Sequence, residues 1–245
     1  DHNTAAPMSS ACFRQRLLMP AFALAATIAA PAAADELAVP EDICFQVLSD
    51  GRDIGRHRIR FEAQGDRLVA EIAIDLEVRF GPLTLFRYTH RNRETWQDGR
   101  LIAIATRTDD DGRLYAVDGR ASGGEFLVEG SSGSLRLPAA VMPTSYWRED
   151  MMQRAPWLDT QAGRLAAVSV APARADGGDL RSYAVRGALA LTAGYDDRGR
   201  WRALRFAARG SDVVYRPCPP EESARPWRFA FSDVAADAPP RAARD

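Results

Sequence analysis

A period-two pattern of apolar residues between Leu68 and Phe80, with charges at most positions in between, constrains the fold of this chain more than any other feature. Apolar side chains occupy every even position of the stretch, and charges stand at the odd positions 71, 75, 77 and 79. Successive side chains of a β-strand point to opposite faces, so a period of two is typical of a strand. The stretch predicts one long strand with one face on a core and the other in water.

Turn residues divide the rest of the chain into similar segments. Ser49–Gly51, Gly65–Asp66 and Gly81–Pro82 separate apolar runs, and Asp98–Gly99 is a dipeptide typical of tight hairpins. The runs between such signals have lengths common for strands. Strands are expected over residues 43–48, 54–61, 68–80, 85–96, 101–108, 114–117, 125–128, 134–137, 165–170, 180–192, 201–208 and 213–216.

This succession predicts an all-β domain over residues 35–216, an antiparallel meander that forms an up-and-down β-barrel, closed or open, of ten to twelve strands. One stretch departs from the pattern: residues 145–154 lie among tryptophans, methionines and prolines, and we expect one short helical insertion there. From Pro217 onward prolines, alanines and scattered charges dominate. Residues 217–245 are therefore expected to form a disordered tail.

The first segment carries the features of an export signal. Arg14 and Arg16 precede an apolar run from Leu17 to Ala30, and small residues follow up to Ala34. We expect residues 1–34 to be a signal peptide cleaved after Ala34, with an upstream extension before Met8, and the domain to be periplasmic. The run is short for a membrane span of about 20 residues, which makes a retained anchor the alternative. No later segment approaches the length of a span, so no transmembrane segment is expected in the mature chain.

Charge excludes one class of partner. The formal net charge is −1, and every basic residue is an arginine. A groove for nucleic acid needs a clear basic excess on one face, so no nucleic-acid partner is expected.

Several short motifs resemble those of an exported proteobacterial family of unknown function, which is similar to uncharacterised open-barrel periplasmic domains. The resemblance covers residues 43–216 and implies a barrel fold and an exported location, with no established site. The motifs that carry it are Asp50-Gly51, Ile54-Gly55, His90 with Glu94 and Trp96 before Asp98-Gly99, Pro143-Thr144-Ser145-Tyr146-Trp147, Asp159-Thr160-Gln161 with Gly163, Tyr195-Asp196 and Tyr215-Arg216.

The hairpin around Asp98-Gly99 holds the best candidate for a ligand pocket. A two-residue loop would pair Gln97 with Arg100, and from there Glu94 with Ala103 and His90 with Arg107. One face would then combine aromatic and polar side chains opposite small alanines, leaving room for a ligand. Together with two aromatic residues of the insertion that could act as a lid, the expected pocket is Tyr88, His90, Asn92, Glu94, Trp96, Arg107, Tyr146 and Trp147.

A purely structural interpretation competes with this pocket. Glu94 could pair with an arginine and His90 could be a satisfied interior group, since buried polar atoms must find partners. The insertion could likewise be an ordinary plug. A slip of one residue in the hairpin register would move the whole set to the outer face.

The sequence offers little for catalysis. No serine stands in a Gly-x-Ser-x-Gly elbow, and no phosphate-binding glycine loop is present. Asp109 to Gly112 lacks the alternating ligands of a calcium loop. Cys44, Cys218, His57 and His90 could in principle gather around zinc, but no two of them are close in sequence. We therefore expect no metal and no cofactor, and an enzyme is the least favoured of the functions considered.

Two cysteines remain in the expected mature chain, Cys44 at the start of the first strand and Cys218 after the last. A meander that closes on itself brings these strands together, and an oxidising periplasm would join the thiols, so a Cys44–Cys218 disulfide is one hypothesis and two separate thiols the other. The functional hypothesis is a periplasmic β-barrel that binds or carries an amphipathic small ligand such as a lipid. The alternative is a non-catalytic envelope assembly or interaction protein with a filled barrel and unknown protein partners.

Overall fold

The alternating stretch lies in the middle of the main sheet. In the structure, a computed structural model that describes residues 37–174 and 179–234, β3 (Arg67–Phe80) pairs with β2 (Arg52–Gln64) on one side and β4 (Leu83–Gln97) on the other, both antiparallel. The even residues Ala70 and Ile72 are buried in the core, as the alternation predicts, but Val69 and Ala73 on the other face are buried as well, where water was expected. Charged partners such as Arg60, Glu71 and Arg93 meet on the other face.

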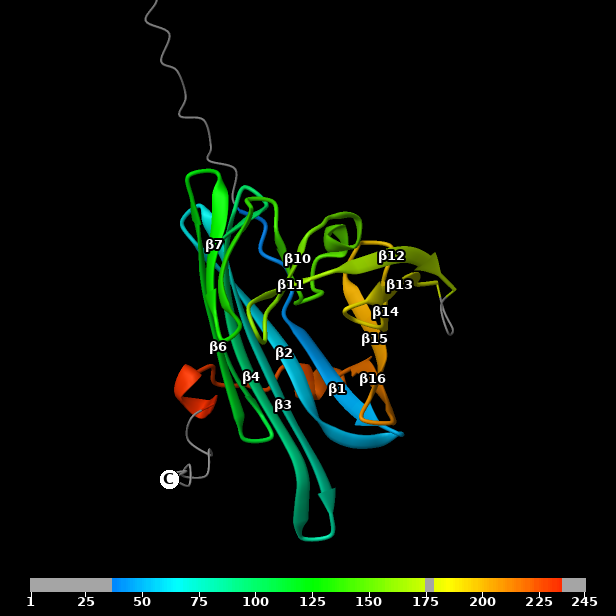
Figure 1. Cartoon of the computed structure of the whole chain (residues 1–245). Helices are drawn as coiled ribbons and strands as arrows, with labels where there is room; N and C mark the ends of the chain where they lie inside the picture. The colour runs from blue at the N-terminus through cyan, green and yellow to red at the C-terminus, as the bar shows by residue number, and fades with distance from the viewer. Residues whose placement is uncertain (1–36, 175–178, 235–245) are drawn as a thin grey trace, which may run out of the picture. The chain divides into compact units, whose positions relative to one another are not determined.

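Thirteen strands form this sheet, in the spatial order β12 to β16 followed by β1 to β8. The order confirms an antiparallel meander, and Figure 1 shows the strands running side by side in this sequence. The expected strand over 180–192 is divided into two strands of this sheet, which raises its count from twelve to thirteen. The expected strand over 165–170 is also divided, but its first part belongs to a second, smaller sheet. The remaining strands of the sheet are β1 (Ile43–Ser49), β5 (Arg100–Asp110), β6 (Arg113–Ser122), β7 (Glu125–Gly130), β8 (Gly133–Pro138), β12 (Val168–Ala173), β13 (Arg181–Gly187), β14 (Leu191–Tyr195), β15 (Trp201–Ala208) and β16 (Ser211–Pro217).

The first and last strands of the domain are neighbours. β1 pairs antiparallel with β16, from Phe45 opposite Pro217 to Ser49 opposite Val213. Cys44 and Cys218 stand at the end of this pair with Cα atoms 5.3 Å apart, and their sulfurs are bonded. The disulfide hypothesis is thereby confirmed in the structure.

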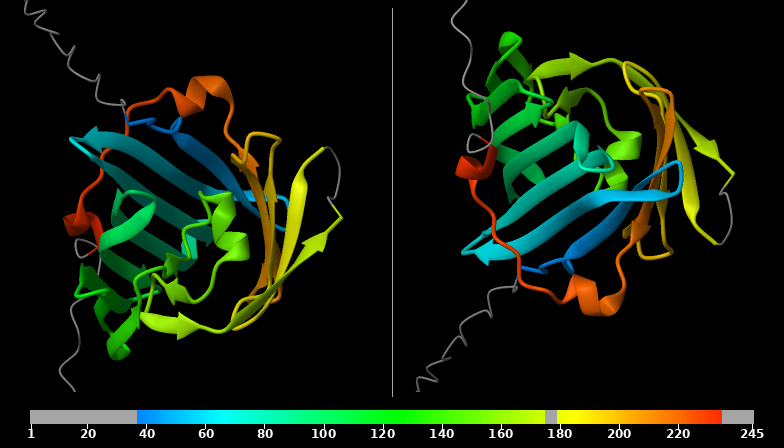
Figure 2. Two further views of the ribbon diagram at one scale, coloured as in Figure 1. Left: turned by 90° about the horizontal axis from the view of Figure 1, so that it is seen from above. Right: turned by 90° about the horizontal axis from the view of Figure 1, so that it is seen from below.

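The sheet is open between β8 and β12, and the inserted segment occupies its concave side. Figure 2 shows the curved sheet from both ends, with the segment between β8 and β12 inside the curve. The insertion holds a second, three-stranded sheet and one short 3-10 helix, so the expected helical insertion is present. Its elements are β9 (Met142–Pro143), η1 (Glu149–Gln153), β10 (Trp157–Asp159) and β11 (Arg164–Ala166).

The segment after β16 lies along the outer face of the sheet. It contains α1 (Pro220–Ser223) and η2 (Phe231–Val234), and η2 packs on β4 and β5. Trp227 stacks against Arg60 and Phe229 against Arg93, so residues 217–234 are held in place where a disordered tail was expected. The proline and alanine content suggested disorder. The contacts that hold the segment could not be seen in its local sequence, because the arginine partners of its aromatic rings are distant in the chain.

Some expectations fall on other parts of the chain. The signal peptide, its cleavage after Ala34 and the final residues 235–245 lie outside the described residues. Within the described ranges, no helix has the length and apolar character needed to cross a bilayer.

Candidate functional site

The half of the interior around Glu94 is filled with side chains. Glu94 is completely buried, and its carboxylate accepts hydrogen bonds from the indole nitrogens of Trp96 and Trp147, each 3.0 Å from Oε2, and from Asn92 Nδ2, 2.9 Å from Oε1. The two indoles meet edge to face at 5.5 Å. Burial raises the pKa of Glu94, and the hydrogen bonds from Trp147 and Asn92 partly offset this. Among the described residues no arginine pairs with Glu94, contrary to the structural interpretation above, because two indoles and an amide take that role.

A β-bulge changes the register that was expected for the β4–β5 hairpin. Gln97 pairs with Arg100 and Trp96 with Leu101, as predicted, but the register shifts between Thr95 and Trp96. Beyond the shift Glu94 faces Ile104, Asn92 faces Thr106 and His90 faces Thr108. The even-numbered residues of β5 therefore share the inner face, in place of the expected alanines.

The same shift corrects the position of Arg107. This residue pairs with Arg91 across the hairpin and lies on the outer face. Its guanidinium binds Asp118 and stacks against the ring of Phe231, with its carbon 5.7 Å from the ring centroid. Arg107 therefore does not belong to the interior set.

A cavity of about 390 Å³ occupies the other half of the interior. Its walls come from β2 to β4, from β14 to β16, from the loop at 188–190 and from two parts of the insertion, residues 144–146 and 159–161. The apolar walls include Ile72, Ile74, Leu191, Leu204 and Phe206, and the polar ones are His57, Tyr88, His90, Asn92, Thr144, Ser145, Tyr146, Asp159, Thr160, Gln161 and Tyr215.

His57 is the least satisfied polar group at this cavity. Its ring is enclosed edge-on by Trp201 at 5.2 Å and Tyr215 at 5.6 Å, and only 3 % of the residue is exposed. Neither ring nitrogen has a hydrogen-bond partner among the described residues, and Asn92 Oδ1 also lacks one. Burial lowers the pKa of His57 to about 3, so the imidazole is neutral at physiological pH and offers one donor and one acceptor.

His90 is neutral for the same reason but has a partner. Its Nδ1 lies 2.7 Å from Thr108 Oγ1, and burial lowers its pKa to about 3. The bulge is responsible for this contact, since the expected register would have placed Arg107 opposite. A histidine next to a threonine can be satisfied without charge, whereas an arginine would have brought a charge into the interior.

The tyrosines of the cavity are uncharged as well. Tyr88 donates a hydrogen bond to Gln161 Oε1 at 3.1 Å, and Gln161 Nε2 in turn donates to Asp110. Burial raises the pKa values of Tyr88, Tyr146 and Tyr215 above the usual range for phenols. The one acidic wall residue, Asp159, is paired with Arg164 at 2.9 Å. The cavity thus presents neutral donors and acceptors beside apolar surface.

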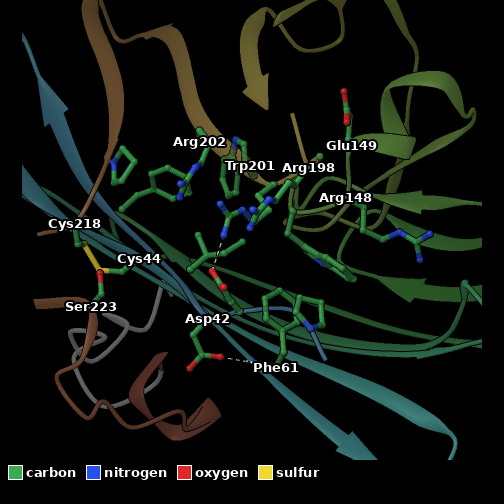
Figure 3. Close-up of a pocket in the computed structure, with 18 of the residues that line it drawn as sticks. Asp42, Cys44, Phe61, Arg148, Glu149, Arg198, Trp201, Arg202, Cys218 and Ser223 are labelled. Carbon is green, nitrogen blue, oxygen red and sulfur yellow. Dashed lines mark hydrogen bonds and ion pairs between the residues drawn. A yellow bond between two sulfur atoms is a disulfide. The ribbon is translucent and has the colours of Figure 1, made fainter. Parts of the chain in front are cut away.

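A second hollow, of about 580 Å³, lies beside the disulfide and has a different character. Figure 3 shows aromatic side chains such as Trp201 among several arginines at this hollow. The charges there are largely matched: Arg148 pairs with Asp150, Arg200 with Glu41, and Arg202 with Asp196. These pairs are mostly solvated, and we find no unpartnered buried group there comparable to His57 among the described residues.

Comparison with known proteins agrees with this architecture. The profile of a family described as a domain of unknown function, DUF6134, matches residues 45–218. The chain belongs to the DUF6134 family. No curated protein matches it. A solved structure of a beta-barrel-like protein of the domain of unknown function DUF1849 from Brucella abortus is similar, with a TM-score of 0.51 at 12 % identity over 74 % of this chain and 96 % of that one. At this identity the likeness shows the fold alone, and it confirms the expected barrel-like architecture.

The expected pocket residues of this DUF6134 domain divide into three groups. Four of them line the cavity, namely Tyr88, His90, Asn92 and Tyr146. Glu94, Trp96 and Trp147 belong to the filled half of the interior, although Trp147 also lines the second hollow of about 580 Å³, and Arg107 lies on the outer face. The structure therefore brings part of the expected set to one cavity, and whether a ligand occupies it stays a prediction.

Sequence reasoning missed His57 as a cavity residue and considered it only as a zinc ligand. A signal for its position existed: His57 shares its parity with Ile59 and Phe61, which are buried core residues of β2. Thr160 and Tyr215 were also missed. They reach the cavity from segments far apart in the chain, and no local pattern could have brought them together.

Proposed function

We propose that this DUF6134 domain binds a small, uncharged, amphipathic ligand in the 390 Å³ cavity. The observation that carries the proposal is the set of three buried, unpartnered polar atoms at its wall, the two ring nitrogens of His57 and Oδ1 of Asn92. Each buried polar atom without a partner costs about 1–3 kcal/mol. A ligand with a hydroxyl or amide group would supply the missing hydrogen bonds.

The charge state of the walls defines the class of ligand. His57 and His90 are neutral, and the tyrosines keep their protons. No free cation stands among the described wall residues to neutralise a carboxylate or phosphate, and burial of an unpaired charge is very costly. The apolar part of the ligand would pack against Ile72, Leu204 and Phe206. A neutral polar head on a short apolar body fits these walls best.

The size of the cavity limits which lipids could be the ligand. Pockets for drug-sized molecules measure about 300–1,000 Å³, and this cavity is at the lower end of that range. A single short chain or a small ring system is compatible with that volume. A complete diacyl lipid would have to leave most of its chains outside.

We also propose that the domain acts in an oxidising compartment after export. The Cys44–Cys218 disulfide supports this, because such bonds persist in secreted and periplasmic proteins and are rare in the cytosol. Sequencing the N-terminus of protein isolated from the periplasm of expressing cells tests the address. A terminus at Asp35 is the expected result, and exclusive recovery from the cytosol would contradict it.

The binding proposal is tested with N-phenyl-1-naphthylamine, a small neutral fluorophore whose emission rises in apolar surroundings. We expect saturable binding that a medium-chain monoacylglycerol displaces more effectively than the fatty acid of equal length. Ala190 lies at the cavity but is exposed, so Ala190→Trp should obstruct the cavity without disturbing the core. Ala121→Trp places the same side chain on an exposed site of β6 and is the matched control.

Equal binding by the two tryptophan variants would contradict the proposed cavity. Equal displacement by neutral and anionic competitors would contradict the proposed ligand class. If native mass spectrometry of protein from its own source finds only apo protein and the fluorophore does not bind, the interaction-protein alternative gains support. The filled half around Glu94 is the observation that favours this alternative.

A further inference from the structure

The hairpin between β3 and β4 extends beyond the rest of the sheet. Pairing of β2 with β3 ends at Gly55 opposite Leu76, and pairing of β4 with β5 ends at Tyr88 opposite Asp110. Residues 77–87 therefore form ladder pairs only with each other, up to Phe80 opposite Leu83, and at the base of the ribbon Arg87 also exchanges hydrogen bonds with Asp111. Figure 1 shows this two-stranded ribbon projecting past the neighbouring strands. At about 3.3 Å per residue, four residues give a projection of about 13 Å.

The end of this ribbon is apolar and exposed. Phe80 is 74 % exposed, Leu83 59 % and Leu85 55 %. These are three of the six large hydrophobic residues that are exposed in the described part of the chain, and they fall within six consecutive positions. Single exposed apolar residues are ordinary, but such a group at the end of a projection marks an interaction site.

The charges of the ribbon complement an anionic surface. The ribbon of residues 77–87 contains two arginines and one acidic residue, Glu77 at its base, so its formal net charge is +1. Arg79 and Arg87 flank the apolar tip, where both contact Glu77 at the base of the ribbon. Their side chains are 61 % and 43 % exposed, so they can reach phosphate groups while the apolar residues go deeper.

The contact area argues for a membrane rather than a second copy of the chain. Three apolar side chains at the end of a narrow ribbon present on the order of 400 Å² in total, whereas a stable protein interface buries about 800 Å² on each partner. A bilayer interface needs no matching shape and accepts small apolar groups beside cationic ones. The backbone of the ribbon is already paired internally, which shallow insertion requires.

We propose that the β3–β4 tip docks the domain on an anionic lipid surface, with Phe80, Leu83 and Leu85 in the interfacial layer and Arg79 and Arg87 at the headgroups. The inference holds whether or not the cavity binds a ligand. If both hold, β4 links them directly, since Tyr88 of the cavity wall is the next residue after the ribbon. The cavity would then lie close to the bilayer from which an amphipathic ligand could come.

The test is flotation with unilamellar vesicles of phosphatidylcholine alone and of phosphatidylcholine with an equal part of phosphatidylglycerol. We expect wild type to float with the anionic vesicles, less at high salt, and the triple variant Phe80→Ser, Leu83→Ser, Leu85→Ser to bind at least about tenfold more weakly. The control is a triple serine variant of the other three exposed large hydrophobics, Val39, Leu114 and Leu165, which should float like wild type.

A second measurement covers the case in which the tip variant is impaired in folding. The single variant Leu83→Trp should show a blue shift of tryptophan emission when anionic vesicles are added. Absence of wild-type flotation, equal flotation of the tip variant, or no shift with Leu83→Trp would each overturn the proposal. So would a wild-type dimer in sedimentation velocity that the tip substitutions dissociate, if no vesicle binding accompanies it.

Discussion

Replacing Glu94, in the filled half of the barrel, can show separately how its charge and its hydrogen bonds contribute to stability. The carboxylate accepts from both indoles at Oε2 and from Asn92 at Oε1. In Glu94→Gln the amide oxygen can keep both indole bonds. The new NH₂ group would face Asn92, whose own amide can turn to present Oδ1, an atom that has no partner in the wild type. Asn92 Nδ2 then takes the place in which Oδ1 has no partner, so the two indole donors stay satisfied and the Asn92 amide exchanges an unpartnered acceptor for an unpartnered donor.

Glu94→Leu has a similar volume but removes the acceptor. Three buried N–H groups, of Trp96, Trp147 and Asn92, would lose their partner at about 1–3 kcal/mol each. Relief of the buried carboxylate offsets part of this loss. Glu94→Gln removes the carboxylate as well but keeps the two indole bonds, which cost about 1–3 kcal/mol each when lost. We therefore expect Glu94→Leu to lower the free energy of unfolding by about 2–6 kcal/mol relative to Glu94→Gln, a large share of the usual 5–15 kcal/mol of a domain.

The pH dependence gives a second result for the same residue. Because the folded pKa of Glu94 is raised above its value in the unfolded chain, the folded state binds more protons between the two pKa values. The stabilisation from a protonated Glu94 is complete below the unfolded pKa, near 4.5, and is lost as the pH rises through the folded pKa. Glu94→Gln removes this loss and should be at least as stable as wild type at pH 8.

Urea unfolding of the three proteins at pH 5 and pH 8 measures both effects. Glu62→Leu and Glu62→Gln, at an exposed position of β2, are matched controls and should differ by well under 1 kcal/mol. The reasoning is refuted if Glu94→Leu is as stable as Glu94→Gln. It is refuted equally if wild type becomes more stable relative to Glu94→Gln as the pH rises from 5 to 8.

Three further outcomes are expected. Denatured, unreduced protein spanning the domain should show no reactive thiol at Cys44 or Cys218 in thiol labelling, and labelling of both would contradict the bond. Reduction should destabilise the domain by up to about 5 kcal/mol, the chain-entropy value for a closed loop of this length. Because burial lowers the pKa of His57 to about 3, the contribution of its neutral ring to folding stability is present above pH 6.5 and is lost as the pH falls toward 3. His57→Phe should therefore flatten the acid side of the plot of stability against pH. An unchanged plot in urea titrations would count against a buried neutral imidazole. Gly55→Ala would place Cβ 2.0 Å from the carbonyl oxygen of Asp75 at a φ of +143° and should lower the free energy of unfolding by more than about 3 kcal/mol in thermal or urea unfolding. Gly65→Ala, with open space around it, should lower it by about 1 kcal/mol. Similar losses in both variants would show that the close approach of the strands does not require glycine at position 55.

Local patterns predicted the strands well because each strand carries its own signal. The alternation in β3 and the Asp98-Gly99 turn depend only on neighbouring residues, and both are in the structure as expected. The pairing of β1 with β16 was also predicted, from a meander expected to close between its first and last strands; the sheet is joined there and is open between β8 and β12. What these cases share is that one segment, or simple topology, determines the result.

The candidate pocket was predicted less well because a single extra residue controls its composition. The bulge at Thr95 and Trp96 contains no glycine and has no evident sequence signal. It exchanges the inner and outer residues of β5, which moves Arg107 outside and brings Thr108 to His90. Counting alternate residues from the turn predicted correctly which side chains face inward up to the bulge, and wrongly beyond it.

The distribution of charge across the sheet links the fold to the proposed ligand. The chain has 32 basic and 33 acidic residues, yet the described walls of the cavity hold only neutral groups and the paired Asp159. The arginines of β2, β4 and β5 lie on the outer face, where Glu71 and Asp118 pair with them and the aromatic residues of the segment after β16 cover them. Strand alternation makes this separation possible, and the bulge preserves it by keeping Arg107 outside. Under the proposed function, a cavity free of unpaired charge in so charged a chain would select against ionic ligands, and its unpartnered neutral nitrogens at His57 would select for a ligand that can donate and accept hydrogen bonds.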